Sequence, residues 1–551
     1  MSAEFQIGAA GLGIGAFSGV LDVLSSCTKL YGMWRSLRGL DGQLSILRAK
    51  LLLQQALLEQ WQRDWLLDTP NTSGHRSSRK QSWVKQHEVA ITETLSAVRT
   101  LLQELEPLRE ASEKKTSNQS VIAASANRLV WANSKAADSE KALEHLDSLL
   151  AGIYRLLPPQ TPNTHTSQVL LSMDDIASES GDFESLVSAL STGSKRGSTT
   201  SSTSSTLEKT FGLRNLGDKL KEDLDKRVDQ FTHRSSTANL AIKASRVQIR
   251  THDQSTAGFR SFGNLDGMED VLVEWKKYDS TWQGKKGIEL TGRIFNIAQL
   301  LNSETKPDEL LTLKCLGFFD DPERSAYGFV FQIPPGSPYP SLKTDGKYPM
   351  ASLKSLLDTP SPNTLPTLED RYHAAYSLAL SLSILHGVSW LHKSIRSQNV
   401  LFVVAPDGRP IWSRPYLVGF EFSRPDAIDE SSEKPEQSAR FNVYRHPLAQ
   451  GTPGEGYRKA FDVYSLGVLL TEIAMWRPAW KLYKDGVDPA AFRQLLVQKA
   501  ADWTCHLMGV DYHNATMHCL GGDQPRDQSR LAQNFYVNVV EVLGRLVAGS
   551  S

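Results

Sequence analysis

The chain has 551 residues, of which 40% are hydrophobic and 22% are charged, an ordinary composition for a globular protein with roughly two to four domains. Lys and Arg together number 61, and so do Asp and Glu. This balance argues against nucleic acid as a dominant partner, because nucleic-acid-binding domains carry a basic excess. The four cysteines are dispersed, mostly singly, along the chain, which excludes a disulfide framework and favours a cytoplasmic protein.

Residues 5–21 form an uncharged, apolar segment with five glycines. A membrane-spanning helix needs about 20 apolar residues, and glycine disfavours a helix by up to about 1 kcal/mol per position. A secretory signal needs a basic start, whereas the only early charge is Glu4. The segment is therefore neither an obvious span nor an obvious signal.

Residues 21–157 show apolar side chains at helical spacing throughout. Three stripes carry this pattern: Leu44, Leu47, Leu51, Leu58, Trp61 and Trp65; Ile91, Leu95, Val98, Leu102 and Leu105; and Leu143, Leu146, Leu150, Ile153 and Leu157. Each stripe predicts one amphipathic helix, and several such helices predict a bundle that ends at Pro158. We expect polar breaks at 68–80 and 112–120. The basic string HRSSRK (75–80) is then a solvated interhelix loop or a contact to anionic lipid.

Two segments differ in character from the bundle. In residues 161–210 we expect a disordered linker, since 12 of the 16 residues from Ser191 to Thr206 are Ser or Thr and bury too little apolar surface to order the chain. Residues 211–254 predict a charged helical connector, with apolar residues at Leu213, Leu216, Leu220, Leu224 and Val228. This connector is either a solvated helix that leans on a neighbour or a regulatory brace.

From about residue 255 to 551, strand-like runs at 271–279, 312–320 and 327–333 precede long helical patterns at 368–388 and 462–476. Strands followed by helices over nearly 300 residues predict an α+β domain. Near its end, Cys505, His506, His513, His518 and Cys519 cluster in sequence. They lack the spacing typical of zinc ligands, so we expect helix-packing residues there and no metal site.

Four strings occur in a fixed order in this region: LHKSIRSQNVL (391–401), LVGFE (417–421), YRHP (444–447) and FDVYSLGV (461–468). Together they resemble the catalytic loop, the D-F-G motif, the end of the activation segment and the following helix of protein kinases. The resemblance covers roughly residues 255–551 and implies a bilobal kinase-like fold. A glycine-rich phosphate loop is not found in the strand region.

Where the family has its catalytic-loop aspartate, this chain has Ser394, and where the D-F-G motif has its metal-binding aspartate, it has Gly419. Kinase phosphoryl transfer needs a carboxylate base and bound Mg²⁺. Serine is no such base near neutral pH, and glycine has no side chain to bind a metal. The resemblance therefore implies a pseudokinase with no catalytic residues; the alternative is an active Ser/Thr-type protein kinase that uses a shifted carboxylate.

Other family positions are retained. By the resemblance, His392 and Phe420 stack in the kinase core, and Asp462 ties the catalytic-loop backbone to its helix. Lys276 or Lys277 matches the phosphate-binding lysine, with Glu289 as its candidate partner. Asn399 keeps its place as a metal ligand. Lys276 and Asn399 would thus form a residual site that binds ATP without turnover.

The opening segment from Glu4 to Trp61, and residues 127–158 with their central Trp131, resemble the fungal HeLo domain of the prion-inhibition and propagation type. The resemblance covers roughly residues 1–160. Combined with the kinase-like part, the arrangement is similar to the mixed-lineage kinase domain-like pseudokinase. By resemblance, the bundle is a membrane-targeting effector whose first segment, with Ile7, Leu12, Ile14 and Phe17, enters lipid; otherwise that segment is the buried first helix.

We therefore expect four parts: a HeLo-like bundle (1–160), a linker (161–210), a connector (211–254) and a pseudokinase (255–551). The expected function is non-catalytic signalling in regulated cell death or heterokaryon incompatibility. An upstream protein or ligand acts on the pseudokinase, and the bundle oligomerises and moves from the cytoplasm to the plasma membrane. The rivals are an active kinase and a soluble scaffold without a membrane role.

Overall fold

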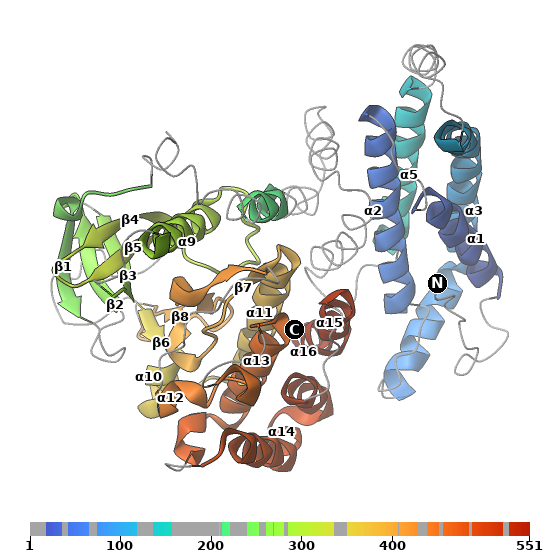
Figure 1. Cartoon of the computed structure of the whole chain (residues 1–551). Coiled ribbons are helices and arrows are strands. Elements are labelled where there is room, and N and C mark those ends of the chain that lie inside the picture. Colours follow the sequence, from blue (N-terminus) through green and yellow to red (C-terminus); the bar gives the residue numbers. More distant parts are fainter. Residues whose placement is uncertain are drawn as a thin grey trace. The chain divides into compact units, whose positions relative to one another are not determined.

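The computed structural model describes residues 18–35, 42–65, 74–117, 136–156, 209, 212–220, 240–252, 260–267, 269–279, 285–334, 350–405, 407–426, 438–450, 456–483, 487–521 and 528–550. The chain divides into two compact units, Met1–Ser204 and Ser205–Ser551 (Figure 1). The expected membrane residues Ile7, Leu12, Ile14 and Phe17 lie outside the described residues. So does the expected linker, apart from residue 209.

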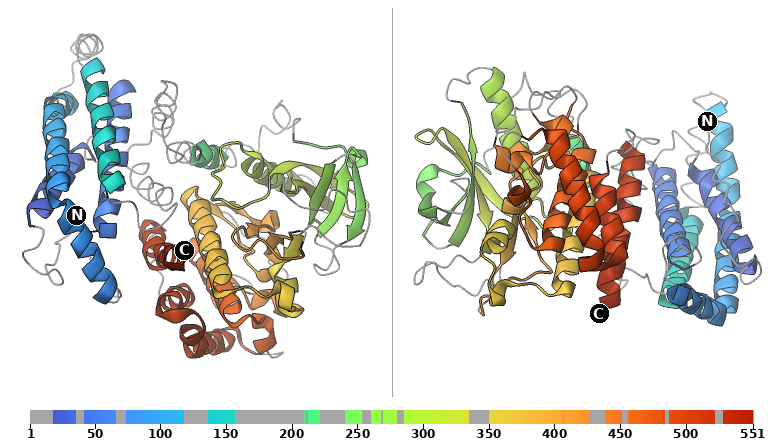
Figure 2. Two further views of the ribbon diagram at one scale, coloured as in Figure 1. Left: turned by 180° about the vertical axis from the view of Figure 1, so that it is seen from behind. Right: turned by 90° about the horizontal axis from the view of Figure 1, so that it is seen from below.

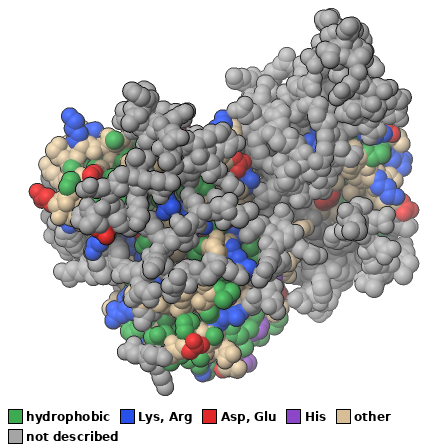
Figure 3. Space-filling view, viewed as in Figure 1, with side chains coloured by type: hydrophobic (Ala, Val, Ile, Leu, Met, Phe, Trp, Pro, Cys, Tyr) green, Lys and Arg blue, Asp and Glu red, His purple; other side chains and the backbone are tan. Residues whose placement is uncertain are grey.

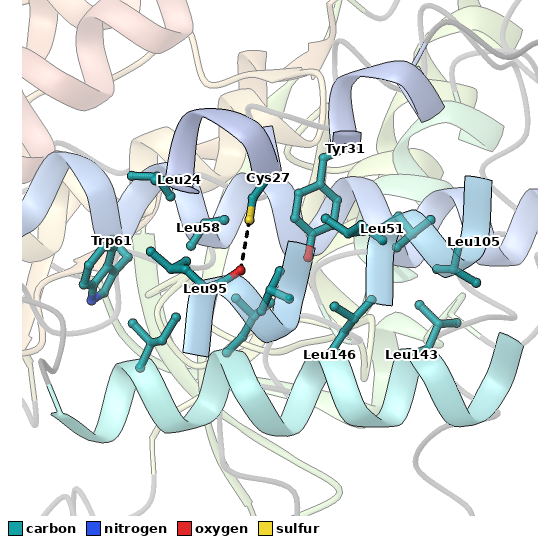
Figure 4. Packing of buried hydrophobic residues seen from close by; sticks show 14 of the residues in the cluster. Leu24, Cys27, Tyr31, Leu51, Leu58, Trp61, Leu95, Leu105, Leu143 and Leu146 are labelled. Carbon is teal, nitrogen blue, oxygen red and sulfur yellow. Dashed lines mark hydrogen bonds between the residues drawn. The ribbon is translucent and has the colours of Figure 1, made fainter. Parts of the chain in front are cut away.

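The first unit is helical, as its sequence predicted. Its described helices are α1 (Ser18–Arg35), α2 (Gly42–Trp65), α3 (Gly74–Ser117) and α5 (Ala136–Leu156). Helix α1 packs on α2 and α3, and α5 packs on α2 and α3 (Figure 2). Their apolar stripes meet in one core that contains Leu24, Leu51, Trp61, Leu95 and Leu146 (Figure 4).

One boundary in this unit was wrong. The string HRSSRK (75–80), which we expected in a loop, lies within the first turns of α3. Residues 112–117 of the second expected break are also helical. Between Gly74 and Pro107 the chain contains neither glycine nor proline, and Arg and Lys favour helices. The polarity that indicated a loop therefore belongs to a helix.

The bundle core contains a short chain of polar side chains. Tyr31 of α1 donates to Gln54 Oε1 of α2 at 3.4 Å, and Gln54 Nε2 donates to Asp147 Oδ1 of α5 at 2.6 Å. Cys27 Sγ donates to the Leu95 carbonyl at 3.3 Å. Burial raises the pKa of Cys27 to about 11, so this thiol stays protonated and acts as a packing residue.

The second unit begins with an antiparallel sheet. Its strands are β1 (Val247–His252), β2 (Arg260–Leu265), β3 (Glu269–Lys277), β4 (Cys315–Asp321) and β5 (Ala326–Gln332), in the order β1-β2-β3-β5-β4. Alternation along β3 places Val271, Val273 and Trp275 in a cluster with Phe319 and Val330. The intervening Glu274 and Lys276 therefore lie on the opposite face of the strand.

Helix α9 (Lys285–Asn302) packs on β4. The later helices are α10 (Leu353–Asp358), α11 (Leu368–Gly387), α12 (Ala439–Asn442), α13 (Lys459–Met475), α14 (Pro489–Leu520), α15 (Gln528–Phe535) and α16 (Glu541–Ser550), with a π-helical turn at Tyr536–Val540. Short strands β6 (Met350–Ser352), β8 (Val400–Val403) and β9 (Tyr416–Leu417) form a second sheet, and β7 (Trp390–Leu391) pairs with β10 (Arg424–Pro425). An antiparallel sheet followed by helices confirms the α+β character.

Helix α13 is buried on all sides from Lys459 to Ala474, and α11 and α14 pack against it. Helix α14 bends at Gly509, whose φ of 80° only glycine adopts readily. Across this bend Thr504 Oγ1 lies 2.7 Å from His513 Nδ1. In the described part of the chain, no group of three or more His, Cys, Asp or Glu side chains is arranged to hold a metal ion.

Part of the expected connector is described. Residues 212–220 are helical and pack within the second unit, with Leu213 and Leu220 buried. Residues 247–252, which we also expected in the helical connector, instead form strand β1. Arg214 donates to the Gly387 carbonyl, and Asn296 of α9 donates to the Leu220 carbonyl at 3.4 Å. Residues 212–220 therefore contact both α9 and the C-terminal end of α11.

Two features concern the protein surface. Among the described helices, none combines the length and the apolar character that crossing a membrane requires. On the face seen in Figure 3, basic and acidic side chains of the described residues are interspersed, in line with the equal numbers of the two signs in the sequence.

Candidate functional site

Within the second unit, the segments singled out in the sequence meet at one buried centre. The 391–401 segment runs through β7, a 3₁₀ turn at Ser397–Asn399 and β8. The 417–421 segment ends β9 and enters a 3₁₀ turn at Phe420–Phe422. Asp462, in the first turn of α13, connects the 391–401 segment to that helix.

Asp462 is fully buried and accepts four hydrogen bonds. The backbone amides of His392 and Lys393 donate to it at 2.8 and 2.9 Å, the Tyr457 hydroxyl donates at 2.8 Å, and His386 Nε2 lies at 3.3 Å. Burial alone would favour the protonated acid, but the hydrogen bonds that the carboxylate accepts, first of all the one from His386, lower the pKa of Asp462. Lys393 has a φ of 66°, so the carboxylate holds a strained loop residue in place.

His392 packs on Phe420 with ring centroids 4.5 Å apart. Burial lowers the pKa of His392 to about 4, so the ring is neutral at pH 7. Its Nδ1 accepts a hydrogen bond from the Ser394 amide at 3.2 Å. These contacts are structural: they fix the loop from 392 to 394 and expose no group for acid–base chemistry.

Ser394 and Asn399 contact each other directly. Asn399 Nδ2 donates to the Ser394 carbonyl at 2.7 Å and to its hydroxyl at 3.0 Å. The Asn399 Oδ1 atom accepts from the guanidinium of Arg260. Both ends of this carboxamide are therefore engaged within the protein.

Arg260 of β2 and Glu274 of β3 form a buried ion pair, with Nε and Oε1 2.6 Å apart. We call this pair the Arg260–Glu274 bridge. Arg260 also donates to the Gln398 carbonyl at 2.6 Å, and the Gly419 amide donates to Glu274 Oε2 at 2.9 Å. Burial raises the pKa of Glu274, and Arg260 opposes that rise. The bridge thus joins the five-stranded sheet to the 391–401 segment and to the 417–421 segment.

Gly419 is required by the geometry of this centre. Its φ is 84°, in the left-handed region, and a Cβ atom placed on it would lie 2.2 Å from Asn399 Nδ2. Real Cβ contacts are never so short, so no other residue fits without moving Asn399. The space in which an aspartate side chain would begin is occupied by Asn399.

Of the two candidate lysines, Lys276 shares a strand face with Glu274 and is buried, whereas Lys277 is exposed. Lys276 Nζ lies 4.1 Å from the centre of the Phe422 ring. It lines a cavity of about 10 Å³ together with Ile294 of α9 and Glu421. Glu289 lies in α9, but its side chain is outside the described residues. Lys276 thus packs against Phe422, whereas Asn399 is hydrogen-bonded to Ser394 and Arg260.

Sequence reasoning missed Arg260 and Glu274, which organise the centre. The run Val271-Leu272-Val273-Glu274-Trp275 contained a signal, because a charged residue within an otherwise apolar strand must find a partner when it is buried. Its partner, Arg260, lies directly opposite it in the β2–β3 register. That register was not accessible before the strands were paired.

Among the comparisons with known proteins, the match to a family model lies in the first unit. A search of curated proteins found no match to this chain. Residues 11–125 match the model of the HeLo family, which is described as prion-inhibition and propagation. The matched residues include all of α1, α2 and α3, the helices that carry most of the bundle core. The match supports a HeLo domain at residues 11–125 of this chain.

Proposed function

We propose that this protein is a non-catalytic signalling protein of regulated cell death or heterokaryon incompatibility. In this proposal a kinase-like second unit without phosphoryl-transfer activity regulates a HeLo bundle that targets membranes. The HeLo match at residues 11–125 supports the signalling class, since a HeLo domain suggests fungal cell-death or incompatibility signalling. The bundle oligomerises when activated and moves from the cytoplasm to the plasma membrane.

Several contacts support the kinase-like part of the proposal. Asp462 binds two successive loop amides, the role that the family resemblance assigned to it. His392 packs on Phe420, as the resemblance also required. A five-stranded antiparallel sheet precedes the helices, and α9 follows its third strand, which fits a small lobe followed by a large one.

The observation that carries the non-catalytic assignment is the combination of the Arg260–Glu274 bridge with Gly419. Magnesium binding needs carboxylate oxygens, but positions 394 and 419 supply none. The remaining candidate ligand, Asn399 Oδ1, already accepts from Arg260, whose positive charge also repels a divalent cation. These residues do not fit a magnesium–nucleotide complex.

The binding of nucleotide gives a direct test. Full-length protein is titrated with ATP, with and without Mg²⁺, and its thermal unfolding is followed. We expect no magnesium-dependent stabilisation. A stabilisation that requires Mg²⁺ and disappears in Lys276→Met, but persists in the matched Lys277→Met, would contradict the proposal and favour the rival kinase.

The membrane role needs its own experiment, because a soluble scaffold is the other rival. Full-length protein is mixed with vesicles of phosphatidylcholine, with or without phosphatidylserine, and floated through a density gradient. The proposal predicts that protein rises with vesicles. Protein that stays at the bottom with every vesicle composition supports the scaffold instead.

A further inference from the structure

Helix α14 lies at the periphery of the helices of the second unit, where it packs against α13 (Figure 1). Its inner face is formed by buried side chains that recur every four residues: Phe492, Leu496, Ala500, Thr504 and Met508. One side of the helix is therefore fixed in the core. The side chains between these positions form the outer face, which is open to solvent.

Large apolar side chains are concentrated on this outer face. In the described part of the chain ten such side chains are exposed, and four of them lie on α14: Leu495, Trp503, Leu507 and Val510, which are 38, 50, 40 and 59% exposed. Trp503 and Leu507 are four positions apart and are neighbours on the helix, and Val510 follows the bend at Gly509. Single exposed apolar residues are ordinary, whereas a contiguous apolar surface indicates an interaction site.

Two charges of opposite sign lie among these apolar residues. Lys499 is half-buried and precedes Trp503 by one turn, and Asp502 is exposed and accepts a hydrogen bond from Gln498 at 2.7 Å. Among the described residues neither Lys499 nor Asp502 has an ion-pair partner. A carboxylate at this place disfavours contact with lipid, because it would enter hydrocarbon with the apolar side chains. The face therefore suits a protein surface with complementary charge.

A second copy of α14 that lies antiparallel supplies such a surface. With a two-fold axis midway between Lys499 and Asp502, Lys499 of each copy faces Asp502 of the other. The same axis places Leu495 of each copy beside Leu507 of the other. Every favourable contact then occurs twice, as in any isologous interface. A parallel arrangement would instead bring Lys499 against Lys499 and Asp502 against Asp502.

We propose that the outer face of α14, from Leu495 to Val510, is a surface by which two copies of this chain pair. The proposal rests on the oligomerisation in the proposed function and adds the contact that the second unit contributes to it. The occupant is a second copy, because opposite charges and apolar side chains recur symmetrically about one point of the helix.

The size of the surface indicates how strong this pairing is. A fully buried aromatic side chain contributes about 150–250 Å², so four partly exposed apolar side chains offer on the order of 400 Å² per copy. A stable complex buries roughly 800 Å² per partner. We therefore expect a Kd of about 100 µM. Pairing is then rare in dilute protein and common once another contact tethers the copies, because tethering gives an effective concentration of roughly 1 mM.

The test is sedimentation velocity of the full-length protein at concentrations that bracket about 100 µM. In Lys499→Glu a glutamate faces Asp502 of the other copy, and in Asp502→Lys a lysine faces Lys499. Each variant alone is expected to pair at least about tenfold more weakly than wild type. In an equimolar mixture of the two variants opposite charges meet at both contacts. We expect the mixture to pair about as strongly as wild type.

Three further variants separate the surface from general effects. Leu507→Glu places a carboxylate in the apolar contact and is expected to abolish pairing, alone and in mixtures. The control Ile411→Glu changes an apolar side chain outside α14 that is 36% exposed, and Lys277→Glu reverses the charge of an exposed lysine of β3. Both controls are expected to pair as wild type does. Thermal unfolding checks that every variant keeps its fold.

Two results would overturn the inference. If wild type stays monomeric over the whole concentration range, this face does not pair two copies. If wild type pairs and Lys499→Glu, Asp502→Lys and Leu507→Glu pair equally strongly, the chain associates through another surface. Neither result decides the proposed membrane function, which the vesicle flotation assay tests separately.

Discussion

The centres of the two units are stabilised in different ways. The bundle core consists mainly of Leu, Trp, Ile and Val side chains, with a few buried polar side chains such as Gln54, Gln55 and Arg48. The centre of the second unit is built from buried ionised groups, among them Arg260, Glu274 and Asp462. Apolar cores adapt to substitution by repacking, whereas a buried charge that loses its partner keeps its full desolvation cost. We therefore expect the second unit to tolerate fewer changes at its centre than the bundle.

The sharpest way to test this contrast is to introduce an aspartate at position 419, where the proposed kinase resemblance places one. Gly419→Asp adds a Cβ atom 2.2 Å from Asn399 Nδ2 at a residue with positive φ. We expect a loss of about 5 kcal/mol in the free energy of unfolding of the second unit, from strain and overpacking together, and no gain of magnesium binding. Urea unfolding of the full chain measures the loss.

Gly408→Ala is the matched control for that variant. Gly408 also has a positive φ, 83°, but nothing lies within 4 Å of its Cβ position. Backbone strain alone then costs about 1–2 kcal/mol. Equal losses in the two variants would mean that Asn399 moves freely and that the centre is not tightly packed.

The Arg260–Glu274 bridge gives the next largest effect. Arg260→Met leaves the Glu274 carboxylate buried without its partner, and we expect a loss of about 4 kcal/mol. The double variant Arg260→Met/Glu274→Leu removes both charges and is expected to recover much of that loss. The exposed pair Arg246–Asp266, 2.6 Å apart, is the control, since Arg246→Met is expected to change stability little. If the double variant is less stable than either single variant, the bridge is not a coupled pair.

Glu472 of α13 makes the stability of the second unit depend on pH. It accepts hydrogen bonds from the Tyr444 hydroxyl and the Ala479 amide, both at 2.7 Å, and burial raises its pKa from 4.5 to about 7. Between these values the folded protein binds a proton that the unfolded chain has released. The contribution of Glu472 to the free energy of unfolding should therefore fall by roughly 3 kcal/mol as the pH rises from 4.5 to 7. The pKa values of His392 and His446, which burial lowers to about 4, contribute with the opposite sign in this range, so the Glu472 contribution has to be isolated by a variant.

The variant Glu472→Gln isolates this dependence. It keeps the acceptor oxygen and cannot ionise, so we expect its stability relative to wild type to increase by roughly 3 kcal/mol as the pH rises from 4.5 to 7. Denaturant unfolding at a series of pH values measures this difference. Parallel profiles for wild type and variant would show that Glu472 does not titrate in this range.

The smallest effect is expected in the bundle. Gln54→Met replaces the middle of the polar chain by an apolar side chain of similar length, and we expect a loss of about 1 kcal/mol, because the buried Tyr31 hydroxyl loses an acceptor at 3.4 Å. Leu146→Ala, at a fully buried position of the same core, is expected to cost about 2–5 kcal/mol. Thermal unfolding monitored at the tryptophans compares them. A larger loss of stability for Gln54→Met than for Leu146→Ala would mean that the bundle, like the second unit, depends mainly on its buried polar groups.

The sequence predicted helices where periodicity was strong, as in the stripes around Leu51, Leu95 and Leu146, and the strands near Val273 and Val330. It also drew attention to Asp462, which lies in the first turn of α13 and in a recognisable string. It failed at the start of α3, because polar residues without apolar spacing resemble a loop. The Arg260–Glu274 bridge was inaccessible because its partners meet only after β2 and β3 pair, a long-range choice that local patterns do not encode.

The most direct measurement of the central claim is phosphoryl transfer by the purified full-length protein, with ATP labelled in its γ-phosphate and Mg²⁺ or Mn²⁺ present. The account predicts no labelled protein, neither this chain nor a general substrate such as casein, because the centre holds the Arg260–Glu274 bridge and Gly419 where the proposed kinase-like arrangement would need metal ligands. Metal-dependent labelling that is lost in Lys276→Met and retained in Lys277→Met would contradict it.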